Sequence, residues 1–115
     1  MKWRRLTAFE AAILDKLLST DFPGRPELLA QVSAALVRQI DVGGSLEFDA
    51  ESTAAAPVKR RIPIEAQAKD LDGTWIHALL HVVGGRVKEL EFYKDDSSKI
   101  LEIPPLERWE LMKLE

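Results

Sequence analysis

The two histidines of this chain, His77 and His81, have the spacing that most readily suggests chemistry. On a helix, this separation would place both imidazoles on one face, where they could chelate a metal ion. On a strand they would share a face but lie about 13 Å apart, at about 3.3 Å per residue, too far for one ion to bridge. Their run, WIHALLHVV (75–83), lies between an Asp-Gly pair and a Gly-Gly pair, which favours a strand. We therefore predict two half-buried histidines on one sheet face, without a bound metal ion or other cofactor.

A group of carboxylates follows in the next run of the chain. Glu89 and Glu91 alternate along it, and Asp95 and Asp96 come directly after it. Paired carboxylates can act as general acid and general base when burial separates their pKa values. At alternate positions of an exposed strand face they would instead be solvated, and this is the interpretation we favour. We predict no catalytic residue here and expect any role of the patch to be the binding of a basic partner.

Two tryptophans are candidates for anchoring positions. Tryptophan fills protein cores and also dominates the contacts of many interfaces. Trp75 begins the same run as the histidines, so we expect it to pack in the core or on the sheet face. Trp109 follows two prolines near the end of the chain, where it could dock the C-terminal segment.

Two short basic clusters, 2–5 and 59–61, could in principle contact phosphate, since the first includes Trp3. The formal net charge of −3 gives no overall basic field, so we predict no nucleic-acid partner and expect these residues to serve solubility. The chain has no cysteine, which excludes a thiolate nucleophile and any cysteine-ligated metal. It also lacks the GxSxG, GxGxxG and P-loop patterns.

Length and composition predict one soluble domain spanning 1–115. The 115 residues are 46 % hydrophobic and 30 % charged, which is ordinary for a globular protein. The start of the chain lacks the apolar region and cleavage site of a signal peptide, and no window approaches a membrane span. We therefore expect a cytoplasmic protein without a membrane partner.

Helical periodicity is confined to the first third of the chain. Thr7 and Glu10 form a capping box ahead of apolar residues at helical spacing, which predicts a helix over 8–19. After a segment rich in proline and glycine, Pro26 suits a first helical position and predicts a second helix over 26–34. Residues 36–40 could either continue this helix or begin a strand.

The remainder of the chain alternates between apolar and polar residues, as strands do. The predicted strands are 36–42, 45–49, 58–69, 75–83 and 86–94. Pro63 makes the third an edge strand or a bulged one, and the apolar parity of the fifth changes near Lys88-Glu89, which predicts a bulge. Residues 100–115 are expected to form a short extended piece and a tail or last helical turn. The fold class is α+β, with an N-terminal helical hairpin on one face of a roughly five-stranded antiparallel meander.

Two motifs of the chain resemble a family of small bacterial domains of unknown function. Those proteins begin with a helix of the form LTxxExxxLxxLL, matched here by LTAFEAAILDKLL, and end their sheet with a GxVxxLExY strand, matched by GRVKELEFY. Both motifs are structural, so the resemblance implies a fold and no activity. Some such families resemble immunity proteins of bacterial toxin systems in size and class.

Two functional hypotheses follow from these observations. The first is a non-enzymatic protein-interaction domain, of which an immunity protein is one kind, that binds a protein partner or a second copy through an acidic or aromatic sheet surface. Its expected contact residues are Trp75, Glu89 and Glu91. The alternative is a small-ligand-binding protein or enzyme whose pocket lies between helices and sheet, lined by His77, His81 and Trp75. We favour the first because no catalytic motif is visible.

Overall fold

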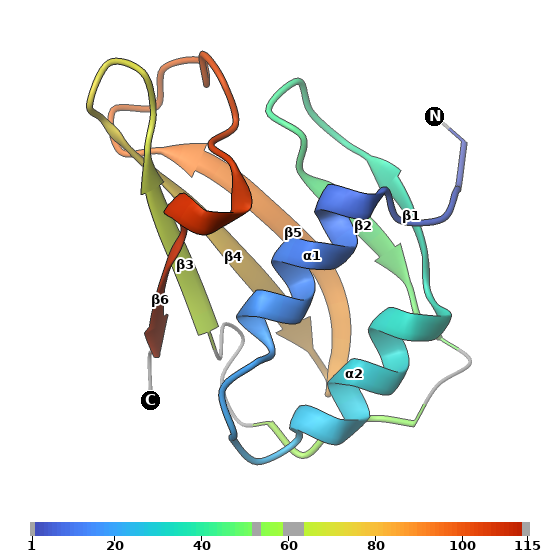
Figure 1. Ribbon diagram of the computed structural model, residues 1–115. Helices are drawn as coiled ribbons and strands as arrows, with labels where there is room; N and C mark the ends of the chain where they lie inside the picture. The colour runs from blue at the N-terminus through green and yellow to red at the C-terminus, as the bar shows by residue number, and fades with distance from the viewer. Residues whose placement is uncertain (1, 52–53, 59–63, 114–115) are drawn as a thin grey trace.

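A computed structural model describes residues 2–51, 54–58 and 64–113. In these residues the elements along the chain are α1 (Ala8–Leu17), α2 (Arg25–Ala34), β1 (Leu36–Gln39), β2 (Leu46–Asp49), β3 (Ile64–Lys69), β4 (Trp75–Val83), β5 (Arg86–Lys94), a 3-10 turn η1 (Leu106–Arg108) and β6 (Glu110–Lys113). Figure 1 shows both helices on the same side of one antiparallel sheet. The predicted α+β class is confirmed. Among the helices described, none is long and apolar enough to cross a membrane.

Helix α1 begins at the predicted residue because Thr7 caps it. The Glu10 amide donates to Thr7 Oγ1 at 3.2 Å, and the Thr7 amide donates to Glu10 Oε1 at 2.8 Å. Arg4 adds an ion pair with the Glu10 carboxylate at 2.8 Å. The helix ends at Leu17, two residues before the predicted end. There the Ser19 hydroxyl donates to the Lys16 carbonyl at 2.6 Å and satisfies one of the carbonyls of the last turn.

Helix α2 begins one residue earlier than predicted and ends at the predicted Ala34. Its N-cap, Gly24, has a φ of 93°, a conformation that glycine adopts without steric cost. Ala35 is extended, so the segment that follows belongs to the sheet, as β1. Strand β1 stops at Gln39 and not at residue 42, because the chain turns there and the Ile40 amide donates to the Ser45 carbonyl at 2.9 Å.

The sheet has six strands in the order β1-β2-β5-β4-β3-β6. Strands β3, β4 and β5 form a meander, and the β1-β2 hairpin joins it through the pairing of Leu46 with Leu90. Strands β4 and β5 have the predicted bounds. Their register shifts between His81, which pairs with Glu89, and Val82, which pairs with Val87. The extra residue is Lys88, which confirms the predicted bulge.

Of the strand predicted over 58–69, the structure describes Val58 and residues 64–69. Strand β3 begins at Ile64, and residues 54–58 before it have no regular structure. The expected edge or bulge at Pro63 and the basic cluster at 59–61 lie outside the described residues.

The C-terminal segment adds a sixth strand that the sequence analysis missed. Strand β6 pairs with β3, with Leu111 opposite Ala66. Trp109 precedes it, is 2 % exposed, donates from Nε1 to the Pro104 carbonyl at 3.0 Å and contacts Phe92 edge to face at 5.9 Å. Trp109 therefore docks the C-terminal segment, as expected.

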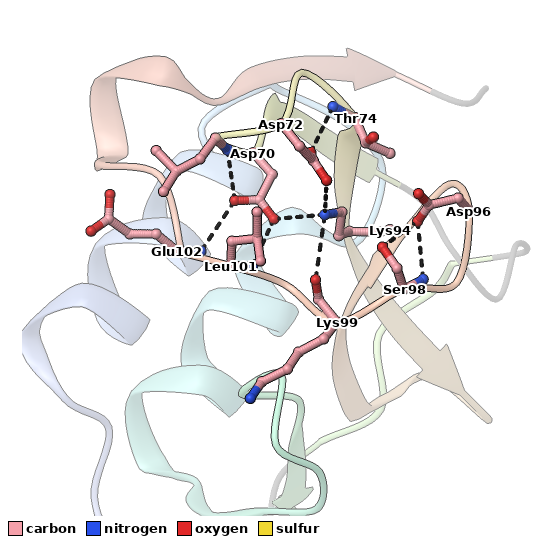
Figure 2. A network of polar contacts seen from close by, with 10 residues as sticks. Asp70, Asp72, Thr74, Lys94, Asp96, Ser98, Lys99, Leu101 and Glu102 are labelled. Atoms are coloured by element: carbon pink, nitrogen blue, oxygen red, sulfur yellow. Dashed lines mark hydrogen bonds and ion pairs between the residues drawn. The ribbon is translucent and has the colours of Figure 1, made fainter.

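A buried ion pair lies at the end of the sheet where β5 ends (Figure 2). The Lys94 ammonium lies 3.0 Å from Asp70 Oδ2 and 2.7 Å from Asp72 Oδ2. The side chain of Asp70 is fully buried, and it accepts hydrogen bonds from the backbone amides of Leu71, Leu101 and Glu102 at 2.8, 2.7 and 3.1 Å. One carboxylate thus joins the β3–β4 turn, the end of β5 and the segment that leads to Trp109.

The protonation of Asp70 follows from these contacts. Burial alone would disfavour the charged form, but the bond from the Leu101 amide, the contact with Lys94 and two further amides outweigh it. Together they hold the pKa of the Asp70 carboxyl well below its usual range.

We expect Asp70→Asn and Lys94→Met each to lower the melting temperature by on the order of 10 °C, since each leaves a buried charge without its partner. Lys99→Met is the matched control, because it removes an ammonium group from an exposed side chain nearby. It should shift the melting temperature by no more than about 3 °C. Thermal unfolding followed by circular dichroism measures both. Equal shifts for the buried and exposed variants would contradict the role of the pair.

The same carboxylate predicts a pH dependence. Because folding lowers the pKa of Asp70, its stabilisation is complete above the unfolded pKa of about 3.9 and is lost as the pH falls toward the lower folded value. The difference in melting temperature between the wild type and Asp70→Asn should therefore narrow as the pH is lowered from about 5 to about 2. A difference that stays constant over this range would show that ionised Asp70 does not stabilise the fold.

Candidate functional site

The two faces of β4 have different surroundings. Ile76, Ala78, Leu80 and Val82 point into the core with the apolar residues of α1 and α2, and the first three are fully inaccessible to solvent. The alternate residues of β4 lie on the other face, which we call the open face: Trp75, His77, Leu79, His81 and Val83. The described residues place no helix on that side.

This arrangement bears on the alternative hypothesis, in which a pocket between helices and sheet is lined by His77, His81 and Trp75. The apolar core lies on the helix side of the sheet, and all three side chains lie on the opposite face. The physical reason is parity, because odd and even residues of a strand point to opposite sides of the sheet.

Cross-strand pairing brings all five expected contact residues to the open face. His81 pairs directly with Glu89, and Glu91 pairs with Leu79, between the two histidines. Paired residues of an antiparallel sheet share a face, so both carboxylates lie on the same face as Trp75, His77 and His81.

His77 is held between two carboxylates. Its Nδ1 lies 2.5 Å from Glu65 Oε2 on β3, and its Nε2 lies 2.5 Å from Asp95 Oδ1 just after β5. The ring also stacks on Tyr93, with centroids 4.9 Å apart. An ionised carboxylate only accepts hydrogen bonds, so the imidazole satisfies both neighbours when both of its nitrogens carry a proton.

The electrostatics agree with a charged imidazole at His77. Burial alone would lower the pKa of His77, but the hydrogen bonds to Glu65 and Asp95 outweigh burial and raise it above its ordinary value. The pKa of Tyr93 is also raised, first by burial and then by the nearby carboxylates. An imidazolium whose two nitrogens both donate hydrogen bonds has no lone pair to accept a proton, so His77 is better suited to hold Glu65 and Asp95 in place than to act as a general base. We call these two contacts the clamp on His77.

The second histidine belongs to a separate cluster. His81 Nε2 lies 2.8 Å from Glu91 Oε1, and one ligand atom from each of His81, Glu89 and Glu91 lies within 4.8 Å of the other two. All three residues are half-buried. On β2, Glu47 pairs with Glu89 and forms its own ion pair with Arg38 at 2.8 Å.

Apolar and aromatic side chains border these clusters on the open face. Trp75 lies at one end of β4, with the Lys69 ammonium 5.1 Å from its ring centroid. Val83 at the other end, Tyr93 on β5 and Met112 on β6 are 43 %, 39 % and 38 % exposed. Met112 shares this face because it pairs with Glu65.

Two residues that complete the site were not singled out from the sequence: Glu65 and Tyr93. Asp95 was already part of the predicted acidic patch. What no local pattern could supply was the register that aligns β3, β4 and β5, because it depends on contacts between distant parts of the chain.

Comparison with known families agrees with the resemblance noted in the sequence. The family model described as "Domain of unknown function (DUF6984)" matches residues 3–104, and the chain belongs to that family. No curated protein and no solved structure matches the chain significantly.

The contacts of His77 with Glu65 and Asp95 predict a raised pKa for its imidazole. In a two-dimensional NMR titration of the imidazole signals, His77 should show a pKa above its ordinary value, and Glu65→Gln should lower that pKa. Glu107→Gln, an exposed glutamate on η1, is the control and should leave it unchanged.

The stabilisation by charged His77 changes with pH in the opposite direction to the stabilisation by Asp70. The stabilisation due to charged His77 is complete below about pH 6.5 and is lost as the pH rises through its raised folded pKa. If the pKa of His77 were the same in the wild type and in Glu65→Gln, the clamp would not exist in solution.

Proposed function

We propose that this member of the DUF6984 family is a protein-interaction domain that binds a partner with a basic surface through the open face of its sheet. One observation carries the proposal. The carboxylates of Glu65, Glu89, Glu91 and Asp95 gather around two histidines on the open face, over which the described residues place no helix. Electrostatic complementarity of this kind favours a partner of opposite charge and speeds its association.

The clamp on His77 favours binding by preorganisation. Glu65 and Asp95 are each fixed by a ring nitrogen of the same imidazole, which itself stacks on Tyr93. Groups that are already ordered lose less conformational entropy when a partner binds. Glu91 is ordered in the same way, since its carboxylate lies 2.8 Å from His81 Nε2.

The apolar border suits a protein partner. Interfaces are enriched in aromatic residues and methionine, which Trp75 and Met112 supply at the edges of the face and Tyr93 supplies beside His77. Association of two copies through this face is less favourable, because a two-fold interface would set the same carboxylates against each other.

An immunity protein of a bacterial toxin system is the specific role we propose. A toxin that acts on nucleic acid must carry a basic surface to bind phosphate, and an acidic sheet face can cover such a surface. A chain without cysteine suits a reducing compartment, so we place the interaction in the bacterial cytoplasm.

The proposal predicts that charge reversal on the open face abolishes binding. Immobilised wild-type protein should retain a basic protein from an extract of its source cells at low salt and release it at high salt. The double variant Glu89→Lys/Glu91→Lys should bind the same purified protein at least about 100-fold more weakly, measured by calorimetry.

The matched control changes the charge equally on the helix side of the molecule. Asp15→Lys/Asp21→Lys alters two exposed aspartates of α1 and the loop after it and should bind within about threefold of the wild type. Circular dichroism must show that both double variants are folded. If the helix-side variant lost binding while the sheet-face variant kept it, the interaction surface would lie on the helix side, which would contradict the proposal. Retention of no basic protein by the wild type would also overturn the proposal.

A further inference from the structure

We infer that His81, Glu89 and Glu91 form a binding site for a divalent transition-metal ion on the open face. One ring nitrogen of His81 and one carboxylate oxygen from each glutamate lie within 4.8 Å of one another. The inference shares Glu89 and Glu91 with the protein interface proposed above, but it can be tested on the isolated chain, without the partner. It also differs from a site shared by the two histidines, because both ring nitrogens of His77 already contact carboxylates.

The backbone places the three ligands on neighbouring strands. His81 pairs directly with Glu89 across β4 and β5, and Glu91 lies two residues further along the same face. Ligands at about 2.0–2.2 Å from a shared tetrahedral ion are about 3.4 Å apart. The 2.8 Å contact between His81 and Glu91 and the 4.8 Å limit on the other separations bracket this value. Side-chain rotation alone can therefore bring the three atoms to a common ion.

The charges around the cluster also favour a cation. Glu47 on β2 pairs with Glu89, so a third carboxylate lies next to the cluster. Arg38 lies 2.8 Å from Glu47 and neutralises that carboxylate. The Glu89 carboxylate forms no hydrogen bond or ion pair with another of the described residues. A bound cation would compensate Glu89 and Glu91 together.

The donor set indicates the class of ion. One imidazole nitrogen with two carboxylates suits zinc and its first-row neighbours, whereas magnesium and calcium prefer oxygen ligands alone. Among manganese, iron, cobalt and zinc, zinc should bind most tightly. The side chains of His81 and Glu91 are 12 % and 36 % exposed, so the ion would keep coordination positions open to water or to a ligand from a partner.

The test is metal binding by the isolated, untagged protein after treatment with a chelator. Calorimetry with zinc chloride should give one equivalent bound with a dissociation constant of about 10 µM or tighter. Cobalt should show visible absorption bands of a coordinated ion that zinc displaces. His81→Ala and Glu89→Gln should each weaken zinc binding more than about tenfold, which is about 1.4 kcal/mol.

Two controls separate ligation from general acidity. Glu47→Gln removes a neighbouring negative charge, and His77→Gln removes the other imidazole, so each should change zinc affinity by less than about threefold. Circular dichroism with each variant distinguishes lost ligands from lost folding. Three results would each overturn the inference. The first is no zinc binding at about 100 µM, which corresponds to about −5.5 kcal/mol of binding free energy. The others are magnesium binding as tight as zinc binding, and equal weakening by Glu47→Gln and Glu89→Gln.

Discussion

The structure depends on the register of β4 against β5, because that register decides which side chains meet the helices. Every even residue of β4 from Ile76 to Val82 packs into the core, so every odd residue is left on the open face. The bulge at Lys88 keeps this division on β5, where Val87 and Leu90 are both buried although three positions separate them. Without the extra residue, Val87 and Leu90 would point to opposite faces. The same bulge sets Glu89 opposite His81, so one irregularity serves both the core and the candidate site.

The buried charges at the end of β5 extend this arrangement to the C-terminal segment. Lys94 has the parity of a core residue, and its ammonium group is satisfied by Asp70 and Asp72 where the apolar core ends. Asp70 in turn accepts hydrogen bonds from the backbone amides of Leu101 and Glu102 (Figure 2). These bonds hold the segment that leads from β5 to β6. A buried pair of this kind adds little net stability relative to apolar residues, but either charge alone is costly. Its contribution is therefore to specify the path of the chain.

Local patterns predicted those parts of the fold that local interactions determine. The capping box located the start of α1, and glycine turns with apolar alternation located β4 and β5 to the residue. Strand β6 was missed because it is four residues long and pairs with β3, more than forty positions earlier in the chain. The same limit applies to the site. Parity could place His77 and His81 on one face, but only the three-strand register reveals that Glu65 and Asp95 hold the first while Glu89 and Glu91 surround the second.

The account rests on a sheet with one covered face and one open face, and hydroxyl-radical footprinting of the free protein at low concentration tests this most directly. Tyr93 and Met112 on the open face should be oxidised rapidly, whereas Phe92 and Trp109, which are 6 % and 2 % exposed in the core, should be protected. Phe92 and Tyr93 are neighbours on β5, so their contrast reports the two faces of a single strand. Protection of Tyr93 and Met112 equal to that of Phe92 and Trp109 would show that the open face is covered and would contradict the account.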